Sequence, residues 1–400
     1  MKDSNKITLI SPFFFPEDIS TGKYNTYLVK SLVESDMQVD VVSSHPFYPD
    51  WKVKKTDLTM PGVVVYRGGL SVKYPQSQIM KRLVLELWYS LYVAKYLIKK
   101  RKTINKVVIV FPPVFSMFFV SFILPGSVHV IGVIHDLQGI MANSESGTFR
   151  SVISKLILKI EKIVFKKLDR VVCLSASMRD ILLTKYNIDS SLLNICYPFV
   201  SAGQCSSDTN YLINEFEGSH KHIVYSGALG EKQRPAKLMM LFDEICRNRK
   251  DIICHIVSRG PVFDDLKKQY SQLNLDGIKF HDLVPEYVLD ELFRRSTMQI
   301  IPQAKGTGAG AFPSKLPNLL SKGVPVFAIC DEGSELSTIL NEFDNCSACH
   351  TWDIEVLIKE ISKFLDEIQN LTHEKNIRNN KHKLDELFNV ASLVRLIKEG

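Results

Sequence analysis

The stretch of sequence that decides the fold is Tyr225-Ser226-Gly227-Ala228-Leu229-Gly230-Glu231-Lys232-Gln233. A short apolar run precedes it from Lys221, and a helical pattern follows it from Leu238. A glycine turn between a strand and a helix lets a ligand approach the backbone, where free helix N–H groups point at it. Lys232 adds a positive charge, so the stretch predicts a phosphate or diphosphate site. An ordinary strand–turn–helix with a solvated lysine is the alternative, because neither the P-loop nor the Gly-x-Gly-x-x-Gly spacing is present.

A second glycine-rich segment has the same setting. The apolar strand from Met298 leads into Gly308–Leu316, which contains Pro-Ser-Lys and opens a helix near Ser314. Gly323 ends that helix before the strand Val324–Ile329. Ligands of open parallel sheets bind at the carboxyl ends of the strands, so we predict that both glycine loops face one crevice.

Length and pattern predict two α/β domains. A chain of 400 residues is too long for a single core. Its apolar runs show little alternation, which indicates parallel sheets covered on both faces. We therefore expect two Rossmann-like, doubly wound domains facing a central crevice, over residues 1–200 and 201–380, joined by a polar linker near residue 205. Residues 381–400 are expected to form a closing amphipathic helix, with the pattern running over Leu384–Lys398.

The predicted strands are Ile7–Ile10, Val39–Ser43, Val63–Tyr66, Lys106–Phe111, Val128–Ile134, Arg170–Leu174, Asn194–Tyr197, His222–Tyr225, Ile252–Val257, Ile278–His281, Met298–Ile301 and Val324–Ala328. The predicted helices of the first half are Tyr24–Ser35, Ile79–Lys99, Val114–Leu124, Phe149–Lys166 and Ser177–Tyr186.

The charge is distributed unevenly. Residues 1–200 carry 26 Lys and Arg against 15 Asp and Glu, a balance of +11, whereas residues 201–400 carry 24 against 28, a balance of −4. Ile79–Lys102 mixes leucines and aromatic residues, including Tyr89 and Tyr96, between basic ends, which favours a helix lying on an anionic membrane surface. Phe149–Lys167 repeats the mixture. The alternative is a core helix with solvated basic ends. The predicted membrane-side residues are Lys81, Arg82, Trp88, Lys99, Lys100, Arg101 and Lys102.

Other features narrow the expected location and partners. No nucleic-acid-binding motif is present, so we expect no nucleic acid partner. The first residues lack a signal-peptide pattern, and the scattered cysteines stand in apolar contexts typical of free thiols in a reducing compartment. Cys346–His350 matches the Cys-x-x-Cys-His pattern of haem attachment, but we expect this match to be a coincidence within a strand. The expected location is cytoplasmic, peripheral on the inner face of the cell membrane.

Several segments stand in a specific order along the chain: His135–Leu137, Leu168–Ser175, Tyr225–Gln233, Pro313–Leu316 followed by Gly323–Val326, and Gly333–Leu336. In this order they resemble the retaining GT-B glycosyltransferases of family 4, and most closely the bacterial enzymes of colanic-acid, O-antigen and capsule assembly. The resemblance spans most of residues 7–340. It implies transfer of a sugar from a nucleotide-diphosphate sugar to a lipid-linked oligosaccharide, with the acceptor in the first domain and the donor in the second.

The resemblance and the chemistry together suggest roles for individual residues. The leaving diphosphate must be neutralised, and lysines and helix N-termini are suited to this task. His135 is expected to contact the sugar and Asp136 to orient it, although a lone histidine is more often a core or surface residue. The expected catalytic residues are His135, Asp136 and Lys232. The expected donor-binding residues are Gly22, Gly227, Lys232, Arg259, Gly260, Gly310, Ser314, Lys315 and Asn318. No Asp-x-Asp pair is convincing, so we expect neither a metal nor another cofactor.

The chain also departs from the family pattern. Gly310 and Asn318 stand where many members have a Glu-x7-Glu pair, and Ala228 stands where many have an arginine, a charge that Arg259 is expected to supply. Cys196–Phe199 replaces the usual Asn-x-x-Asp at the domain junction. These departures keep two alternatives open. One is an inactive relative that acts as a binding or scaffold subunit. The other is a nucleotide-sugar epimerase of the same fold, which the scarcity of acidic residues in these loops opposes.

Overall fold

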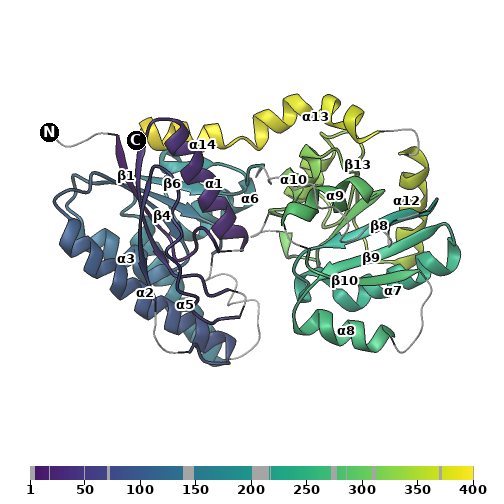
Figure 1. Cartoon of the computed structure of the whole chain (residues 1–400), viewed down its shortest axis with the longest axis horizontal. Helices are drawn as coiled ribbons and strands as arrows, with labels where there is room; N and C mark the ends of the chain where they lie inside the picture. The colour runs from purple at the N-terminus through teal and green to yellow at the C-terminus, as the bar shows by residue number, and fades with distance from the viewer. Residues whose placement is uncertain are drawn as a thin grey trace. The chain divides into compact units, whose positions relative to one another are not determined.

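The structure is a computed structural model that describes residues 5–17, 19–48, 50–69, 73–137, 148–200, 216, 218–271, 277–284, 286–308, 312–368 and 372–399 (Figure 1). The chain divides into two compact units. Unit 1 comprises Met1–Ser201 and Asn389–Gly400, and unit 2 comprises Ala202–Phe388.

The described part of unit 1 contains a seven-stranded sheet in the order β3-β2-β1-β4-β5-β6-β7. All its strand pairs are parallel. The chain builds outward from β1 on one side and from β4 on the other, so the topological switch point lies between β1 and β4. The strands are β1 Lys6–Ile10, β2 Gln38–Ser44, β3 Val63–Gly68, β4 Lys106–Phe111, β5 His129–Ile134, β6 Arg170–Cys173 and β7 Leu193–Ile195.

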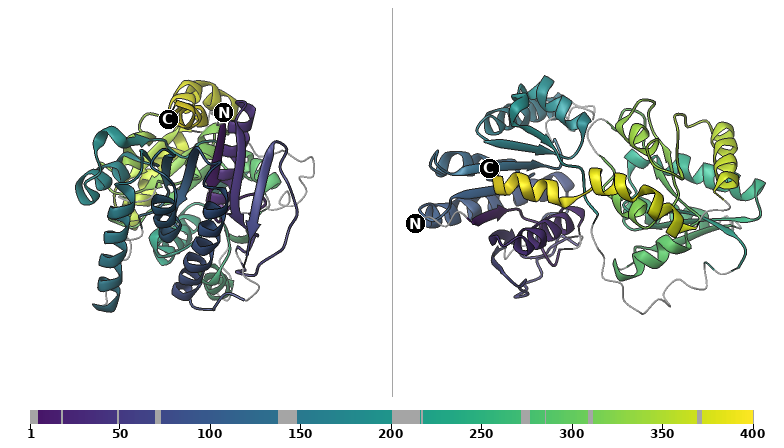
Figure 2. Two further views of the ribbon diagram at one scale, coloured as in Figure 1. Left: turned by 90° about the vertical axis from the view of Figure 1, so that its left-hand side faces the viewer. Right: turned by 90° about the horizontal axis from the view of Figure 1, so that it is seen from above.

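Helices cover both faces of this sheet (Figure 2). On one face, α2, α3, α5 and α6 enclose a core that includes Tyr89, Phe111 and Tyr186. On the other, α1 and α14 pack over a second core that includes Leu28 and Leu393. The helices are α1 Ser20–Glu34, α2 Gln78–Lys100, α3 Val114–Ile123, α5 Thr148–Phe165, α6 Ala176–Tyr186 and α14 Val390–Glu399.

Unit 2 repeats the plan with a six-stranded parallel sheet among its described residues, in the order β10-β9-β8-β11-β12-β13. Its switch point lies between β8 and β11. The strands are β8 Lys221–Ser226, β9 Ile252–Ser258, β10 Ile278–Asp282, β11 Met298–Pro302, β12 Val326–Ile329 and β13 Cys346–Cys349. The helices are α7 Pro235–Asn248, α8 Pro261–Ser271, α9 Glu286–Arg295, α10 Leu316–Ser321, α11 Glu335–Leu340, α12 Ile354–Glu367 and α13 His373–Leu387. The predicted fold class, two Rossmann-like parallel-sheet domains, is confirmed.

The prediction of one closing helix over Leu384–Lys398 is wrong. The chain forms α13 and α14, which are separated at Phe388 and Asn389. The side-chain oxygen of Asn389 accepts a hydrogen bond from the backbone N–H of Ala391 at 2.8 Å, which starts a new helix in the manner of an N-cap. A hydrophobic period alone does not reveal such a break, because both helices continue the same apolar pattern.

The two closing helices are held by different units. In unit 2, the Asn376 side chain of α13 donates to the Gly323 carbonyl at 2.9 Å. In unit 1, Lys106 Nζ donates to the Ile397 carbonyl near the end of α14 at 2.8 Å, and Lys398 Nζ donates to the Ser35 carbonyl after α1 at 3.0 Å. Residues 389–400 therefore fold with unit 1, although they follow unit 2 in the sequence.

Candidate functional site

The glycine turn of unit 2 lies at the carboxyl end of β8, beside the switch point. Gly227 has a φ of 132°, a backbone conformation that side chains disfavour. A Cβ built on it would meet no atom within 4 Å, so the space on that side of the backbone is open. Its N–H donates to the Val257 carbonyl at the end of β9, at 3.0 Å, which holds the turn in place. This is the geometry that admits a ligand against the main chain.

Lys232 follows in a short 3₁₀ turn, Glu231–Gln233, and its side chain is exposed. The turn is well fixed. The backbone N–H of Gly230 donates to Gln233 Oε1 at 3.0 Å, and the Lys232 carbonyl accepts from the Ala304 N–H after β11 at 2.7 Å. The backbone of Lys232 is therefore tied across the switch point, and its ammonium group extends into solvent from a fixed base.

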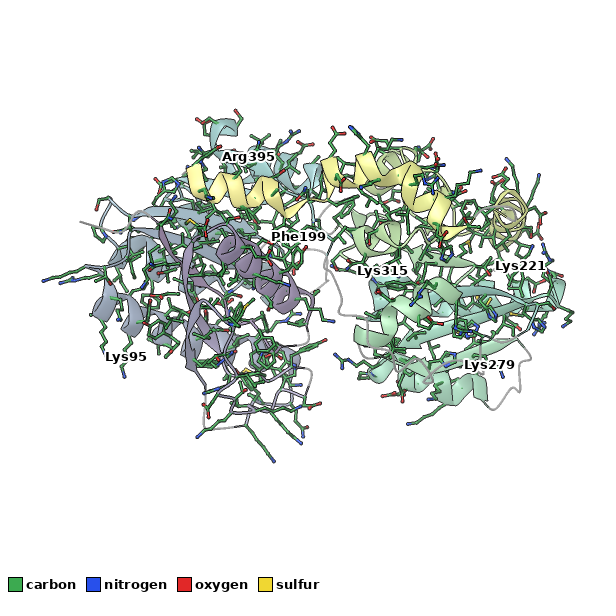
Figure 3. All side chains as sticks on the ribbon, turned by 45° about the horizontal axis from the view of Figure 1, so that its top comes forward. Lys95, Phe199, Lys221, Lys279, Lys315 and Arg395 are labelled. Carbon is green, nitrogen blue, oxygen red and sulfur yellow. The ribbon has the colours of Figure 1, made fainter. Side chains whose placement is uncertain are left out.

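Lys315 lies just before α10, and Figure 3 labels it within unit 2. Its Nζ donates to the Ser226 carbonyl at 3.0 Å and to the Ile300 carbonyl at 3.3 Å, and it lies 4.7 Å from the centre of the Tyr225 ring. These carbonyls belong to β8 and β11, the pair that flanks the switch point. Loss of hydration on burial lowers the pKa of Lys315 to about 7. The lysine thus bridges the two strand ends through main-chain oxygens, contacts that the sequence did not predict.

Four of the other predicted donor residues lie in unit 2, after β9 and β11 in the chain. Gly260 follows β9 with a φ of 104° and open space around a built Cβ, and the half-buried Arg259 precedes it. Ser314 is exposed before α10, and Asn318 is half-buried within it. Gly310 lies outside the described residues.

A small hollow of about 10 Å³ lies beyond the ends of β11 and β12 in unit 2. Known ligand pockets enclose about 300–1,000 Å³, so by itself it is far too small for a nucleotide sugar. Gln303 directly follows β11, and its Oε1 is buried without a hydrogen-bond partner among the residues that the structure describes. Gln303 could have been found from the sequence, because it is a polar residue directly after a predicted strand. The lining residues are Gln303, Gly308, Phe312, Pro313, Ser334, Glu335 and Leu336.

In unit 1, the predicted helix Tyr24–Ser35 starts too late, because Gly22 lies within the helix and not before it. Gly22 is the third residue of α1, which begins at Ser20 instead of Tyr24. A Cβ on Gly22 would lie 2.7 Å from the Glu17 carbonyl oxygen, so only glycine fits this close approach. The residue at the N-cap, Ile19, provides no side-chain hydrogen bond to the first N–H groups of α1.

His135 stands directly after β5, and its backbone N–H donates to the Phe111 carbonyl at 3.0 Å. Its ring meets the edge of the Tyr24 ring, with centroids 4.6 Å apart. Burial lowers the pKa of His135 to about 4, so the imidazole is neutral near pH 7. Asp136, next in sequence, is half-buried. Tyr24 contacts this histidine, yet the sequence did not single it out, because a tyrosine in an apolar helical pattern is typical of a core position.

Two of the aromatic residues on which the membrane prediction for Ile79–Lys102 rested do not face outward. Tyr89 and Tyr96 of α2 are buried in the core, and Trp88 is half-buried, with its Nε1 donating to the Tyr74 hydroxyl at 2.7 Å. The exposed apolar residues of α2 are aliphatic and share one narrow stripe at helical spacing. They are Met80, Leu83, Leu87, Leu91 and Ile98.

The basic residues of this segment divide into two groups. Lys81 Nζ lies 5.5 Å from the Trp51 ring centre, and Lys100 Nζ lies 5.7 Å from that of Tyr66, so both cover aromatic rings of unit 1. The others are exposed: Arg82, Lys99, Arg101 and Lys102. Within the described part of the chain, no helix is both long and apolar enough to cross a membrane. In that same part, no cluster of three or more His, Cys, Asp or Glu side chains is arranged to hold a metal ion.

Comparison with known proteins identifies the class. Residues 21–203 match the family described as Glycosyltransferase Family 4, and residues 210–383 match the family described as Glycosyl transferases group 1. The two matches cover the two sheets in turn. The chain belongs to the family 4 glycosyltransferases of the GT-B fold.

Individual relatives agree with this assignment. The chain is 22% identical over 378 residues, 90% of its length and 92% of the relative's, to the colanic acid biosynthesis glycosyl transferase WcaI of Escherichia coli K12. Its fold is similar to that of WaaG, a glycosyltransferase involved in lipopolysaccharide biosynthesis, with a TM-score of 0.70, 11% identity, and coverage of 98% and 100% of the two chains. It is also similar to Anabaena HepE in complex with UDP, with a TM-score of 0.66, 11% identity, and coverage of 99% and 98%.

Proposed function

We propose that this glycosyltransferase moves a sugar, with retention of its anomeric configuration, from a nucleotide-diphosphate sugar to a lipid-linked saccharide in bacterial surface polysaccharide biosynthesis. The observation that carries the proposal is the open glycine turn at Gly227, followed by the exposed Lys232, at the switch point of unit 2. UDP is bound by the structural neighbour HepE, and colanic acid synthesis is the pathway named for the relative WcaI. Both support a nucleotide donor and a polysaccharide pathway.

In this proposal, the donor diphosphate binds against the backbone at Gly227 and Gly260, where nothing fills the space of a side chain. Lys232 and Arg259 neutralise the charge that develops on the leaving diphosphate. The N–H groups near Gly22, Ser314 and Lys315 add hydrogen bonds, and Gly310 and Asn318 replace the glutamates of other members beside sugar and ribose. His135, oriented by Asp136, contacts the sugar. These cationic groups replace a divalent metal, and no cofactor is required.

The acceptor side of the proposal concerns the layer formed by α2, α3 and α5, in which α2 packs against α3 and α3 against α5. Phe122 of α3 and Ile163 of α5 are exposed in addition to the α2 stripe. The three helices contain nine Lys and Arg residues but only two acidic ones, Glu86 and Glu161, and both are buried. An outer surface that combines apolar side chains with uncompensated positive charge suits the anionic surface of a membrane that holds a lipid-linked acceptor.

One competing function has support from particular residues. Gly310 and Asn318 occupy the positions of the Glu-x7-Glu pair, which fits an inactive relative that only binds a partner or ligand. The intact turn at Gly227 and the exposed Lys232 favour the enzyme. The two hypotheses differ in whether a bound donor is consumed.

The deciding experiment measures sugar transfer or donor hydrolysis with a panel of UDP- and GDP-sugars, comparing the parent protein with Lys232→Ala. Loss of one preorganised contact to the leaving group costs about 10²–10³ in rate. We expect that loss in kcat with an unchanged thermal midpoint, because the Lys232 side chain is exposed and only its backbone is tied into the fold. Lys359→Ala, an exposed lysine on α12, is the control. Donor binding without any turnover in the parent would support the inactive relative instead.

A further inference from the structure

The Tyr24 hydroxyl is a buried polar group that has no hydrogen-bond partner among the described residues. Tyr24 is 8% exposed, and within the part of the chain that the structure describes its hydroxyl makes no hydrogen bond. A buried polar group left unbonded destabilises the fold, so such groups require an explanation. The ring itself is well packed: it stacks on Phe199, labelled in Figure 3, with centroids 4.2 Å apart. Packing therefore explains the phenyl ring and leaves the hydroxyl unexplained.

A second unpartnered polar atom belongs to the ring in contact with Tyr24. His135 Nε2 is likewise buried without a hydrogen-bond partner among the described residues, and the two rings meet edge to face at 4.6 Å. Tyr24 lies on α1, which follows β1, and His135 follows β5. Both therefore stand at the carboxyl edge of the unit 1 sheet, close to its switch point between β1 and β4, where open sheets bind ligands.

The pair suits an uncharged partner. Burial raises the pKa of Tyr24 well above its usual value and lowers that of His135 to about 4, so both groups are neutral near pH 7. A phenol and a neutral imidazole can each donate or accept, but neither supplies the positive charge that a phosphate or carboxylate requires. An alcohol, which donates and accepts at one oxygen, matches both groups at once.

We propose that Tyr24 is a sugar-binding residue, and that its hydroxyl and His135 Nε2 together bind one hydroxyl group of a substrate sugar. The inference rests on the proposed function, which provides two sources of that hydroxyl: the sugar of the nucleotide donor or the saccharide of the acceptor. It adds a second residue to the predicted sugar contact of His135, and it explains why a tyrosine instead of a phenylalanine fills the space beside Phe199.

The test compares Tyr24→Phe with the parent and with Tyr27→Phe as a matched control. Tyr27 lies on the same helix and packs against the same Phe199 ring, with centroids 5.4 Å apart, but it does not contact His135 among the described ring pairs. Dissociation constants are measured for UDP-glucose, UDP-galactose, GDP-mannose and GDP-fucose, and for UDP and GDP alone. The Michaelis constant is then measured for a lipid extract of the source organism as acceptor.

If the donor sugar provides the hydroxyl, Tyr24→Phe weakens the accepted nucleotide sugar about tenfold, the effect of losing one buried hydrogen bond, and leaves UDP or GDP binding unchanged. If the acceptor provides it, donor binding is unchanged and the Michaelis constant for the lipid extract rises by a similar factor. Tyr27→Phe changes neither. The thermal midpoint of Tyr24→Phe is expected to match or exceed that of the parent, because the deleted hydroxyl has no hydrogen-bond partner in the described part of the fold.

Three results would overturn the inference. In the first, Tyr24→Phe keeps both the nucleotide-sugar dissociation constant and the acceptor Michaelis constant within twofold of the parent. The hydroxyl would then bind no sugar, and the proposed glycosyltransferase function would be unaffected. In the second, Tyr24→Phe fails to fold, so that the hydroxyl is a structural group. In the third, no nucleoside diphosphate binds the parent at all, and the proposed function fails together with the inference.

Discussion

At the carboxyl edge of the unit 2 sheet, the Lys315 ammonium group is bonded to main-chain carbonyls of Ser226 and Ile300. Its pKa is lowered to about 7 by burial, well below the usual 10.5 of a lysine. The folded protein therefore favours the neutral amine. Stability from this group is complete above pH 10.5, and it is lost as the pH falls toward 7, where the unfolded chain holds a proton that the fold has released. An anion beside Lys315 would reverse that preference.

The lowered pKa of Lys315 leads to a prediction for ligand binding. If the donor diphosphate contacts Lys315, binding restores the charged form and takes up a proton above pH 7. The dissociation constant of the accepted nucleoside diphosphate should then rise between pH 7 and 9, by up to about tenfold per pH unit. Lys315→Met should flatten that slope, and Lys359→Met on α12 should keep it. Isothermal titration at pH 7, 8 and 9 checks this. Equal slopes in the parent and Lys315→Met would show that Lys315 only bridges β8 and β11.

At the scale of single residues, the sequence reveals groups whose type is unusual for their setting. Gly227 and Lys232 stand out because a glycine turn with a nearby lysine after a strand suits the close approach of an anion to the backbone. Tyr24 does not stand out, because its ring is an ordinary core group and what is unusual, a hydroxyl that finds no hydrogen-bond partner among the residues the structure describes, cannot be seen in the sequence. The bonds of Lys315 also escape prediction, since they join residues 89 and 15 positions apart in the chain. Which oxygens meet an ammonium group depends on the strand order.

At the scale of elements, α2 shows what periodicity predicts and what it leaves open. Its bounds agree with the prediction to within one residue, because a long apolar pattern at helical spacing is a strong signal. The orientation was left open, because the helix is apolar on two sides. One side packs Tyr89 and Tyr96 into the core, and the other exposes the aliphatic stripe. The sequence alone cannot decide which apolar side faces the sheet.

The exposed stripe supports a prediction about membrane binding. Leu87 and Leu91 are 57% and 62% exposed, and inserting such side chains into a bilayer interface contributes about 1–2 kcal/mol each. Leu87→Gln combined with Leu91→Gln should therefore lower partitioning onto anionic vesicles at least about tenfold. Changing Lys99, Arg101 and Lys102 to glutamine should lower it further, with the remaining binding less sensitive to salt. Co-sedimentation of the full chain with vesicles containing phosphatidylglycerol measures both effects.

The matched control is Met240→Gln on α7 of unit 2, since Met240 is 55% exposed and lies outside the stripe. It should bind vesicles as the parent does. Equal binding to neutral and anionic vesicles, or a loss for Met240→Gln as large as that for the α2 variants, would contradict docking through α2. The stripe would then be free to serve another partner.

At the scale of the whole molecule, the strands were predictable and their lateral contacts were not. Both sheets follow from apolar runs that alternate with helices, and the family resemblance implied their order. Three histidines in a row illustrate the lateral contacts. His222 Nδ1 lies 2.9 Å from His255 Nε2, and His255 Nδ1 lies 2.9 Å from His281 Nε2. They come from three neighbouring strands, β8, β9 and β10. Their contact depends on the parallel register, which no local pattern of the sequence encodes.

The last prediction concerns how the molecule neutralises the leaving diphosphate. Enzymes do this either with a divalent cation or with fixed positive groups. Unit 2 carries two fixed positive groups, Lys232 and Arg259, at the carboxyl edge of its sheet. Initial rates after dialysis against EDTA should therefore stay within about twofold of those with added magnesium or manganese. Removing a metal that does not neutralise charge in the transition state leaves the activation free energy of transfer unchanged. The sugar product must be measured directly by chromatography, since coupling enzymes have metal requirements of their own.

A rate that collapses on chelation and returns with magnesium would contradict this prediction. It would assign the neutralising charge to a cation bound with the donor. Lys232 would then bind the diphosphate without being the only group that neutralises it.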